Sequence, residues 1–119
     1  MYDLPEDVDW SFLIGGELLQ VCYGEYQTQL NFHGDVNISI EGDIEHRAGP
    51  LVVGRSDARR QDVTSLLQLL GASVKRVEVE AKNTLLLTFD NGHALKILSD
   101  DRPYESYSIS APGEQTIIV

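Results

Sequence analysis

The chain has 119 residues, 42% of them apolar, which suffices for one domain with its own core. Nine Lys and Arg residues against nineteen Asp and Glu residues give a net charge of −10. Such a field repels phosphate backbones and anionic lipid, so it argues against nucleic-acid and membrane binding and favours a basic protein partner, although it also serves solubility alone. The acidic start lacks signal-peptide features and Cys22 is the single cysteine, so we expect a cytoplasmic protein.

The N-terminal part of the chain is predicted to form an arm and a three-stranded meander. Residues 1–9 carry four carboxylates around Pro5, which is typical of a loosely held acidic arm. Over residues 16–42, apolar and polar residues alternate and glycines mark the turns, as in half-buried antiparallel strands joined by short connections. Residues 42–49 are polar and are predicted to be a loop, followed by a short extended piece at 50–54.

Residues 57–70 are predicted to form the one helix of the chain. Its apolar stripe follows the spacing i, i+3, i+4 and i+7, with Val63, Leu66, Leu67 and Leu70. Ser56 or Asp57 would cap the first turn, and Gly71 would end the helix in the left-handed conformation. The stripe would pack on a sheet and close the core.

The second half of the sequence repeats the first. Four apolar positions recur at a constant offset of 57: Leu30 with Leu87, Phe32 with Phe89, Ile38 with Leu95, and Ile40 with Ile97. Residues 71–98 are therefore predicted to form a second meander, and residues 104–119 to add C-terminal strands. The fold class of the single domain 1–119 is predicted as α+β: two antiparallel β-meanders related by an internal pseudo-repeat, with one intervening α-helix. One curved sheet, a sandwich and a partly open barrel all fit this pattern.

The residue types that usually bind metals or cofactors show no recognisable spacing. G-x-S-x-G, Walker and G-x-G-x-x-G motifs are all missing from the sequence. His33, His46, His93 and Cys22 form no pair with the local spacing of a zinc site, so we expect no metal and no cofactor. Because Cys22 lies within a predicted strand, a buried and inert thiol is the expected state.

Two groups of residues are candidates for contacts with a partner. The first is an acidic patch of Glu41, Asp43 and Glu45, chosen for its charge density. Together with His46 these carboxylates offer oxygen ligands to a divalent cation, but they lack the EF-hand spacing, and a solvated loop is the simpler interpretation. The second group comprises the aromatic side chains of Tyr23, Tyr26, Tyr104 and Tyr107, which suit an interface but also suit a sheet.

The pattern of glycines and apolar residues resembles a family of small bacterial proteins of unknown function. It comprises Trp10-x-Phe12-x-x-Gly15, Leu18-x-x-Val21-x-x-Gly24, Gln27-x-x-Leu30-x-Phe32, Ile38-x-Ile40-Glu41-Gly42 and Phe89-x-x-Gly92-x-x-Leu95. The likeness covers nearly the whole chain, and its motifs are structural. Some members of that family resemble immunity proteins encoded near polymorphic toxin genes, so the resemblance implies a toxin domain as one kind of partner.

The leading functional hypothesis is a non-enzymatic, acidic protein-binding module that neutralises a basic protein such as a toxin domain. Its physical basis is charge complementarity, which speeds encounter and suppresses wrong partners. Two alternatives stay open. One is a small-molecule-binding or enzymatic domain with its site in the sheet concavity, and the other is a structural homodimer without ligand.

Overall fold

The computed structural model describes residues 3–57, 60–62, 64–99 and 106–119, and strands dominate these ranges. In chain order they are β1 (Leu18–Tyr23), β2 (Thr28–Phe32), β3 (Val36–Ile40), β4 (Ile44–Ala48), β5 (Leu51–Asp57), β6 (Arg60–Asp62), β7 (Val74–Glu80), β8 (Thr84–Phe89), β9 (His93–Ile97), β10 (Tyr107–Ser110) and β11 (Ile117–Ile118). The helical segments in these ranges are short 3₁₀ helices: η1 (Trp10–Phe12), η2 (Thr64–Leu69) and η3 (Ala81–Asn83). Within the same ranges, no helix has the length and apolar character needed to cross a membrane.

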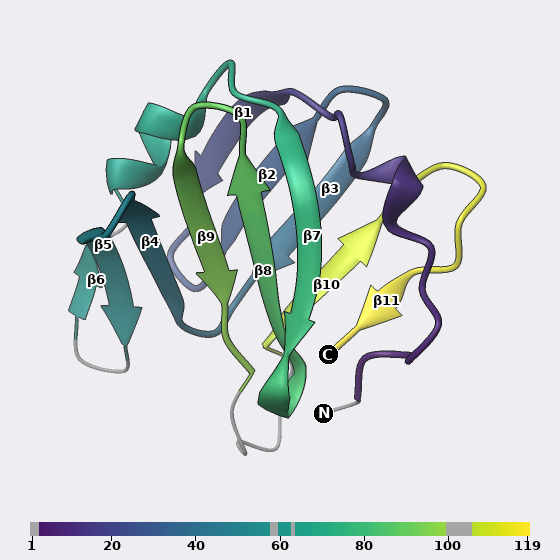
Figure 1. Ribbon diagram of the computed structural model, residues 1–119. Coiled ribbons are helices and arrows are strands. Elements are labelled where there is room, and N and C mark those ends of the chain that lie inside the picture. Colours follow the sequence, from purple (N-terminus) through teal and green to yellow (C-terminus); the bar gives the residue numbers. More distant parts are fainter. Residues whose placement is uncertain (1–2, 58–59, 63, 100–105) are drawn as a thin grey trace.

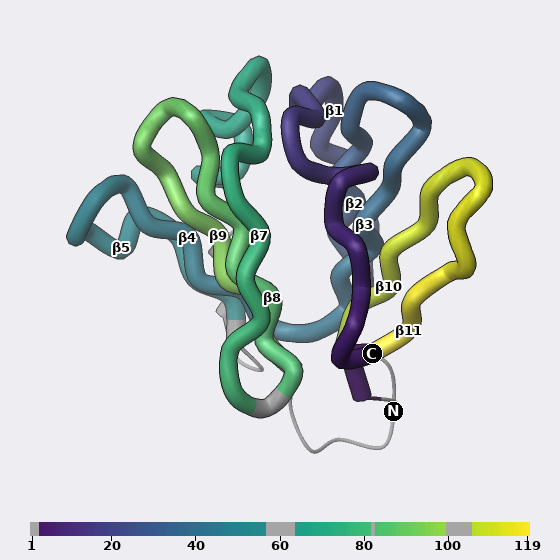
Figure 2. Tube along the Cα trace, turned by 45° about the vertical axis from the view of Figure 1, so that its right-hand side comes forward, coloured from purple at the N-terminus to yellow at the C-terminus, as the bar shows by residue number. Residues whose placement is uncertain are grey.

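The strands form two antiparallel sheets that face each other as a sandwich (Figures 1 and 2). Sheet 1 has the order β1-β2-β3-β10-β11, and sheet 2 has the order β6-β5-β4-β9-β8-β7. The chain passes from sheet 1 to sheet 2 after β3 and returns after β9, so both halves of the sequence contribute to both sheets. Inward-facing side chains of the two sheets, among them Leu30, Ile38, Leu87 and Leu95, are fully buried in one core.

The α+β prediction is wrong, because residues 57–70 contain no α-helix in the part that the structure describes. Strand β6 pairs with β5 and occupies residues 60–62, so the helical segment is shortened to η2. A helix that short gains little from its own hydrogen bonds, and short pieces readily adopt the 3₁₀ form. The predicted capping residue Ser56 lies in β5, where its hydroxyl accepts a hydrogen bond from the Ile44 N–H at 3.2 Å.

The change of helix type also changes the buried face of this segment. In a 3₁₀ helix residues i and i+3 lie on one face, and Leu66 and Leu69 are accordingly fully buried. Leu67 and Leu70, which belong to the predicted α-helical stripe, are 51% and 44% exposed. Val63, the remaining member of the stripe, lies outside the described residues.

The loop predicted at residues 42–49 is also wrong, since Ile44–Ala48 forms strand β4 between β5 and β9. Its inward positions are Ile44 and His46, and both are buried. A histidine at an inward position broke the apolar alternation on which the sequence-based prediction depended.

The internal repeat is present in the structure. Strands β2 and β3 pair in the same way as β8 and β9, and all four pairs of residues related by the offset of 57 are buried. Phe32 and Phe89, for example, are 2% and 1% exposed. The first strand of each meander has a register shift at its start, after Leu18 in β1 and after Val74 in β7.

The two repeats meet where β1 and β7 begin, through reciprocal backbone hydrogen bonds. The Leu18 N–H donates to the Ala72 carbonyl at 2.9 Å, and the Val74 N–H donates to the Gly16 carbonyl at 3.0 Å. Two further bonds repeat the pattern: Gly71 N–H to Leu18 carbonyl at 2.9 Å, and Gly15 N–H to Val74 carbonyl at 2.7 Å. Gly15 and Gly71 have φ values of 86° and 85°, a conformation that strongly favours glycine. This junction joins an edge of sheet 1 to an edge of sheet 2.

The N-terminal arm is held more firmly than its composition suggested. Leu4 is buried, and its N–H donates to the Asn83 side-chain carbonyl at 3.1 Å. The amide of Asn83 donates in turn to Asp3 at 2.8 Å, and the Tyr107 hydroxyl donates to the Asn83 backbone carbonyl at 2.7 Å. Asn83 therefore ties the arm to the core.

The burial of η2 predicts different costs for two neighbouring leucines. Leu66→Ala should lower the free energy of unfolding by about 2–5 kcal/mol, because it leaves a cavity in the core. Leu67→Ala, the matched control, should change it by less than about 1 kcal/mol, because the side chain is half exposed. Urea denaturation of both variants measures the difference, and equal losses would contradict the 3₁₀ register.

Candidate functional site

Charge is distributed unequally between the two sheets. Residues 1–46 and 103–119 contain twelve carboxylate residues and no Lys or Arg, whereas residues 47–102 contain seven carboxylate residues and all nine cationic ones. Every strand of sheet 1 comes from the first group. The strands of sheet 1 themselves carry no charged residue, so the excess of negative charge lies in the segments that flank and connect them, whereas the strands of sheet 2 carry charges of both signs.

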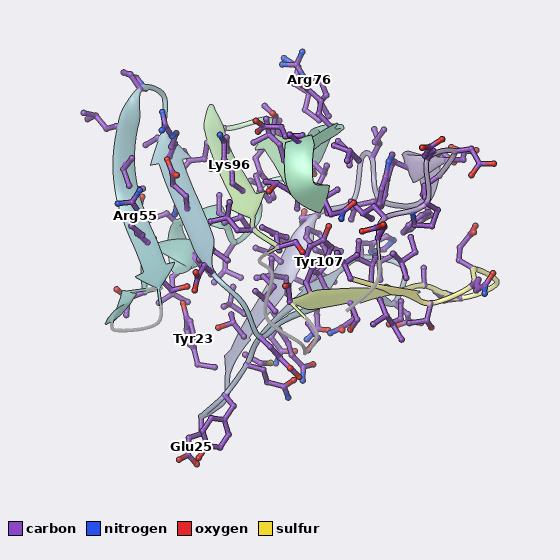
Figure 3. The ribbon with its side chains drawn as sticks, turned by 90° about the horizontal axis from the view of Figure 1, so that it is seen from below. Tyr23, Glu25, Arg55, Arg76, Lys96 and Tyr107 are labelled. Atoms are coloured by element: carbon purple, nitrogen blue, oxygen red, sulfur yellow. The ribbon has the colours of Figure 1, made fainter. Side chains whose placement is uncertain are left out.

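The outer face of sheet 2 is covered by ion pairs. Glu45 contacts Arg47 at 2.6 Å and Arg55 at 3.9 Å, while Lys96 contacts Glu80 at 3.4 Å. Figure 3 shows Arg55, Lys96 and Arg76 on this side of the molecule. Exposed pairs of this kind contribute little to stability, and they balance the charge of the face locally.

The outer face of sheet 1 carries amide and hydroxyl groups instead of charges. We call this surface the amide face; its members are Gln20, Gln27, Gln29, Asn31, Asn37, Ser39, Ser108 and Ser110. Side-chain hydrogen bonds run across the strands: Asn37 donates to Asn31 at 2.7 Å and to Gln29 at 3.2 Å, and Asn31 donates to Gln20 at 3.2 Å. These bonds link the side chains into an uncharged polar surface.

One end of sheet 1 gathers exposed aromatic and acidic side chains. We call this the hairpin patch, and it consists of Tyr23, Glu25, Tyr26 and Glu41. Tyr23 ends β1, and the sheet register places it at the same end as Ile40, which precedes Glu41. Tyr26 is 78% exposed and lines a small cleft of about 20 Å³ together with Glu41. Figure 3 shows Glu25 at the tip of the β1–β2 hairpin, on the side of the molecule opposite Arg76.

The other predicted contact residues lie elsewhere. Glu45 belongs to β4 and is held by its two arginines, and Asp43 is half-buried, so Glu41 is the exposed member of the predicted acidic patch. Tyr107 is 1% exposed and belongs to the core, where burial raises the pKa of its hydroxyl. Tyr104 lies outside the described residues.

A chain of three buried or half-buried polar side chains crosses the inner face of sheet 2. The Ser65 hydroxyl lies 2.9 Å from Nδ1 of His46, and Nε2 of His46 lies 2.8 Å from Nδ1 of His93. His46 is fully buried and Ser65 is 7% exposed. The spacing of these residues in the sequence gives no sign of this arrangement, because they come from three separate elements: β4, η2 and β9.

The pseudo-repeat shows that this polar chain is a departure from the pattern. Strand β4 pairs with β9 as β10 pairs with β3, so His46 opposite Leu95 corresponds to Ile109 opposite Ile38. Burial and, to a smaller extent, the neighbouring His93 lower the pKa of His46 from 6.5 to about 4. His46 is therefore neutral at pH 7, and its two hydrogen bonds satisfy both ring nitrogens. A nucleophilic serine must reach substrate, whereas Ser65 is enclosed and already bonded.

Comparison with known proteins identifies a family but no activity. The chain belongs to a family of unknown function, DUF6188, whose family model matches residues 10–119. No curated protein and no solved structure matches the chain.

The burial of neutral His46 predicts a loss of stability in acid. The unfolded chain binds a proton near pH 6.5 while the folded protein resists it until about pH 4, so stability should fall as pH falls through this window. The loss attributable to His46 should reach about 3 kcal/mol, at 1.36 kcal/mol for each pKa unit. It can be measured by urea unfolding at pH 7 and pH 4.5.

A double variant isolates the contribution of this histidine from that of the many carboxylates. His46→Ile puts an isoleucine where the other repeat has Ile109. Ser65→Ala is combined with it because the Ser65 hydroxyl would otherwise lose its hydrogen-bond partner, His46. Its stability should change less than that of the wild type across the window. His33→Asn, at an exposed turn, is the control and should keep the wild-type profile. Identical profiles for the double variant and the wild type would contradict the prediction.

Proposed function

We propose that the protein is a non-enzymatic binding module that docks a basic protein partner on the hairpin patch and the amide face of sheet 1. The observation that carries the proposal is the separation of charge: residues 1–43 and 103–119, which supply every strand of sheet 1, contain eleven carboxylates and no cation. A field of one sign over one face attracts an oppositely charged partner and accelerates its encounter.

The two surfaces supply complementary parts of an interface. Protein interfaces have a centre depleted of charge and a polar rim, and exposed tyrosines are enriched among the residues that contribute most to binding. The amide face offers an uncharged centre with donors and acceptors, and Glu25 and Glu41 lie at its end. Tyr26 beside Glu41 suits a Lys or Arg side chain, which can contact a ring face and a carboxylate together.

The same features weigh against the alternative functions. The space between the sheets, where the alternative hypothesis of a small-molecule or enzymatic domain would place its site, is filled by the buried side chains of the core. A homodimer through sheet 1 would bring two surfaces of like charge together. A basic toxin domain remains the partner class implied by the family resemblance, and a partner of that charge suits the carboxylates of the hairpin patch.

The proposal predicts that charge reversal in the hairpin patch weakens partner binding. Glu25→Lys combined with Glu41→Lys should slow association about tenfold at low ionic strength, because steering by the field is lost. Wild-type association should itself slow as salt rises, since exposed charges are screened beyond about 8 Å at physiological ionic strength. The measurement is affinity capture from an extract of the source organism, followed by binding kinetics at two salt concentrations.

A matched variant separates local charge from net charge. Glu78→Lys combined with Glu80→Lys makes the same change in net charge on strand β7 of sheet 2, and it should leave association within about twofold of the wild type. A docking surface on sheet 1 would be contradicted if no protein is captured, or if both double variants reduce the association rate equally.

A further inference from the structure

A groove runs between the N-terminal arm and strand β11, at the outer edge of sheet 1. Its volume is about 540 Å³, which falls within the usual range of about 300–1,000 Å³ for ligand sites. Pro5, Val8 and Phe12 form one wall, and residues 114–118 form the other. Figures 1 and 2 show the arm and β11 side by side.

The wall formed by the arm is fixed at both of its ends. Leu4 is buried and bonded to Asn83, and Leu13, which follows η1, is fully buried. Between these anchors the arm does not act as a strand: within the described residues, no backbone hydrogen bond joins it to β11. The groove is therefore a space beside the sheet edge that the arm leaves open.

The edge strand directs backbone groups into this space. The N–H of Val119 donates to the Tyr107 carbonyl at 2.9 Å, and the Val119 carbonyl accepts from the Tyr107 N–H at 3.3 Å. Because bonding directions alternate along a strand, the N–H and carbonyl of Ile118 point away from β10 and toward the groove. An edge of this kind accepts an added strand.

The lining combines apolar surface with negative charge. Val8, Phe12 and Ile117 supply the apolar part, and the residues that line the groove include three carboxylates, Asp3, Asp9 and Glu114, and no Lys, Arg or His. Side chains of an extended peptide alternate between two faces. A segment that alternates basic and apolar residues would therefore match both parts of the lining.

We propose that this groove binds an extended segment of the partner with alternating basic and apolar residues, which adds to sheet 1 beside β11. The inference rests on the proposed function, because the segment belongs to the basic partner that docks on the same sheet. Main-chain hydrogen bonds to Ile118 fix the segment, and the carboxylates of the groove select its charge.

The test uses the whole protein and a capped peptide of seven alternating Lys and Val residues as probe. Titration should shift the backbone amide resonances of residues 116–118 and change the fluorescence of Trp10, whose ring lies 6.0 Å from that of Phe12. A peptide of alternating Glu and Val should not bind. Two further peptides carry N-methyl groups on every second backbone nitrogen, one on the odd and one on the even positions. Only one of these two sets of N–H groups faces β11, so one peptide should lose binding and the other should keep it. Equal effects of the two methylation patterns would overturn strand addition.

Two matched charge variants locate the probe. Glu114→Lys should weaken peptide binding about fivefold or more, whereas Asp7→Lys, an equal charge change on the arm outside the lining residues, should weaken it less than about twofold. Equal effects, or no saturable binding, would overturn the groove assignment. If the peptide does not bind, but Glu25→Lys combined with Glu41→Lys still slows association of the captured partner, the groove assignment is wrong and the proposed binding function stands. If both tests fail, both are wrong.

Discussion

The reciprocal hydrogen bonds between the starts of β1 and β7 are the constraint on which the rest of the structure depends. They hold an edge of sheet 1 against an edge of sheet 2 and thereby fix how the two meanders face each other. Both partners need the left-handed glycines Gly15 and Gly71 just before the paired residues, because a side chain at that φ is strained. With this corner closed, the inward faces meet and bury one continuous core.

Pseudo-symmetry makes the two outer faces comparable position by position, and their differences are informative. Equivalent positions carry Ser39 on sheet 1 and Lys96 on sheet 2, which lie on the matching strands β3 and β9. Folding alone imposes the same demands on both outer faces, because both are solvent-facing sides of antiparallel sheets. Folding therefore does not impose the ion pairs of one face or the uncharged amides of the other, and the binding function proposed above would account for the difference.

The sequence predicted the repeat and the strands of both meanders, because there the period of two was complete and the turns were marked by glycine. It failed where a single residue served two purposes. His46 occupies a core position but binds Ser65, so the sequence of β4 resembled a polar loop. The leucines around Leu67 fit α-helical spacing, although the chain adopts a 3₁₀ helix there. The absence of cations from residues 1–46 was visible in the sequence, but only the sheet order shows that β1, β2 and β3 share one sheet with the C-terminal strands.

The edge of sheet 1 at β11 combines an exposed strand with negative charge. An exposed strand edge invites pairing with further copies of the chain unless it is short, charged or covered. Strand β11 has two residues and the arm beside it, and carboxylates line the space between them, so like charges oppose the pairing of this edge with the same edge of a second copy. A basic segment experiences the opposite force at the same edge. In the proposed binding mode, the same carboxylates determine the chemistry of the segment that this edge can accept.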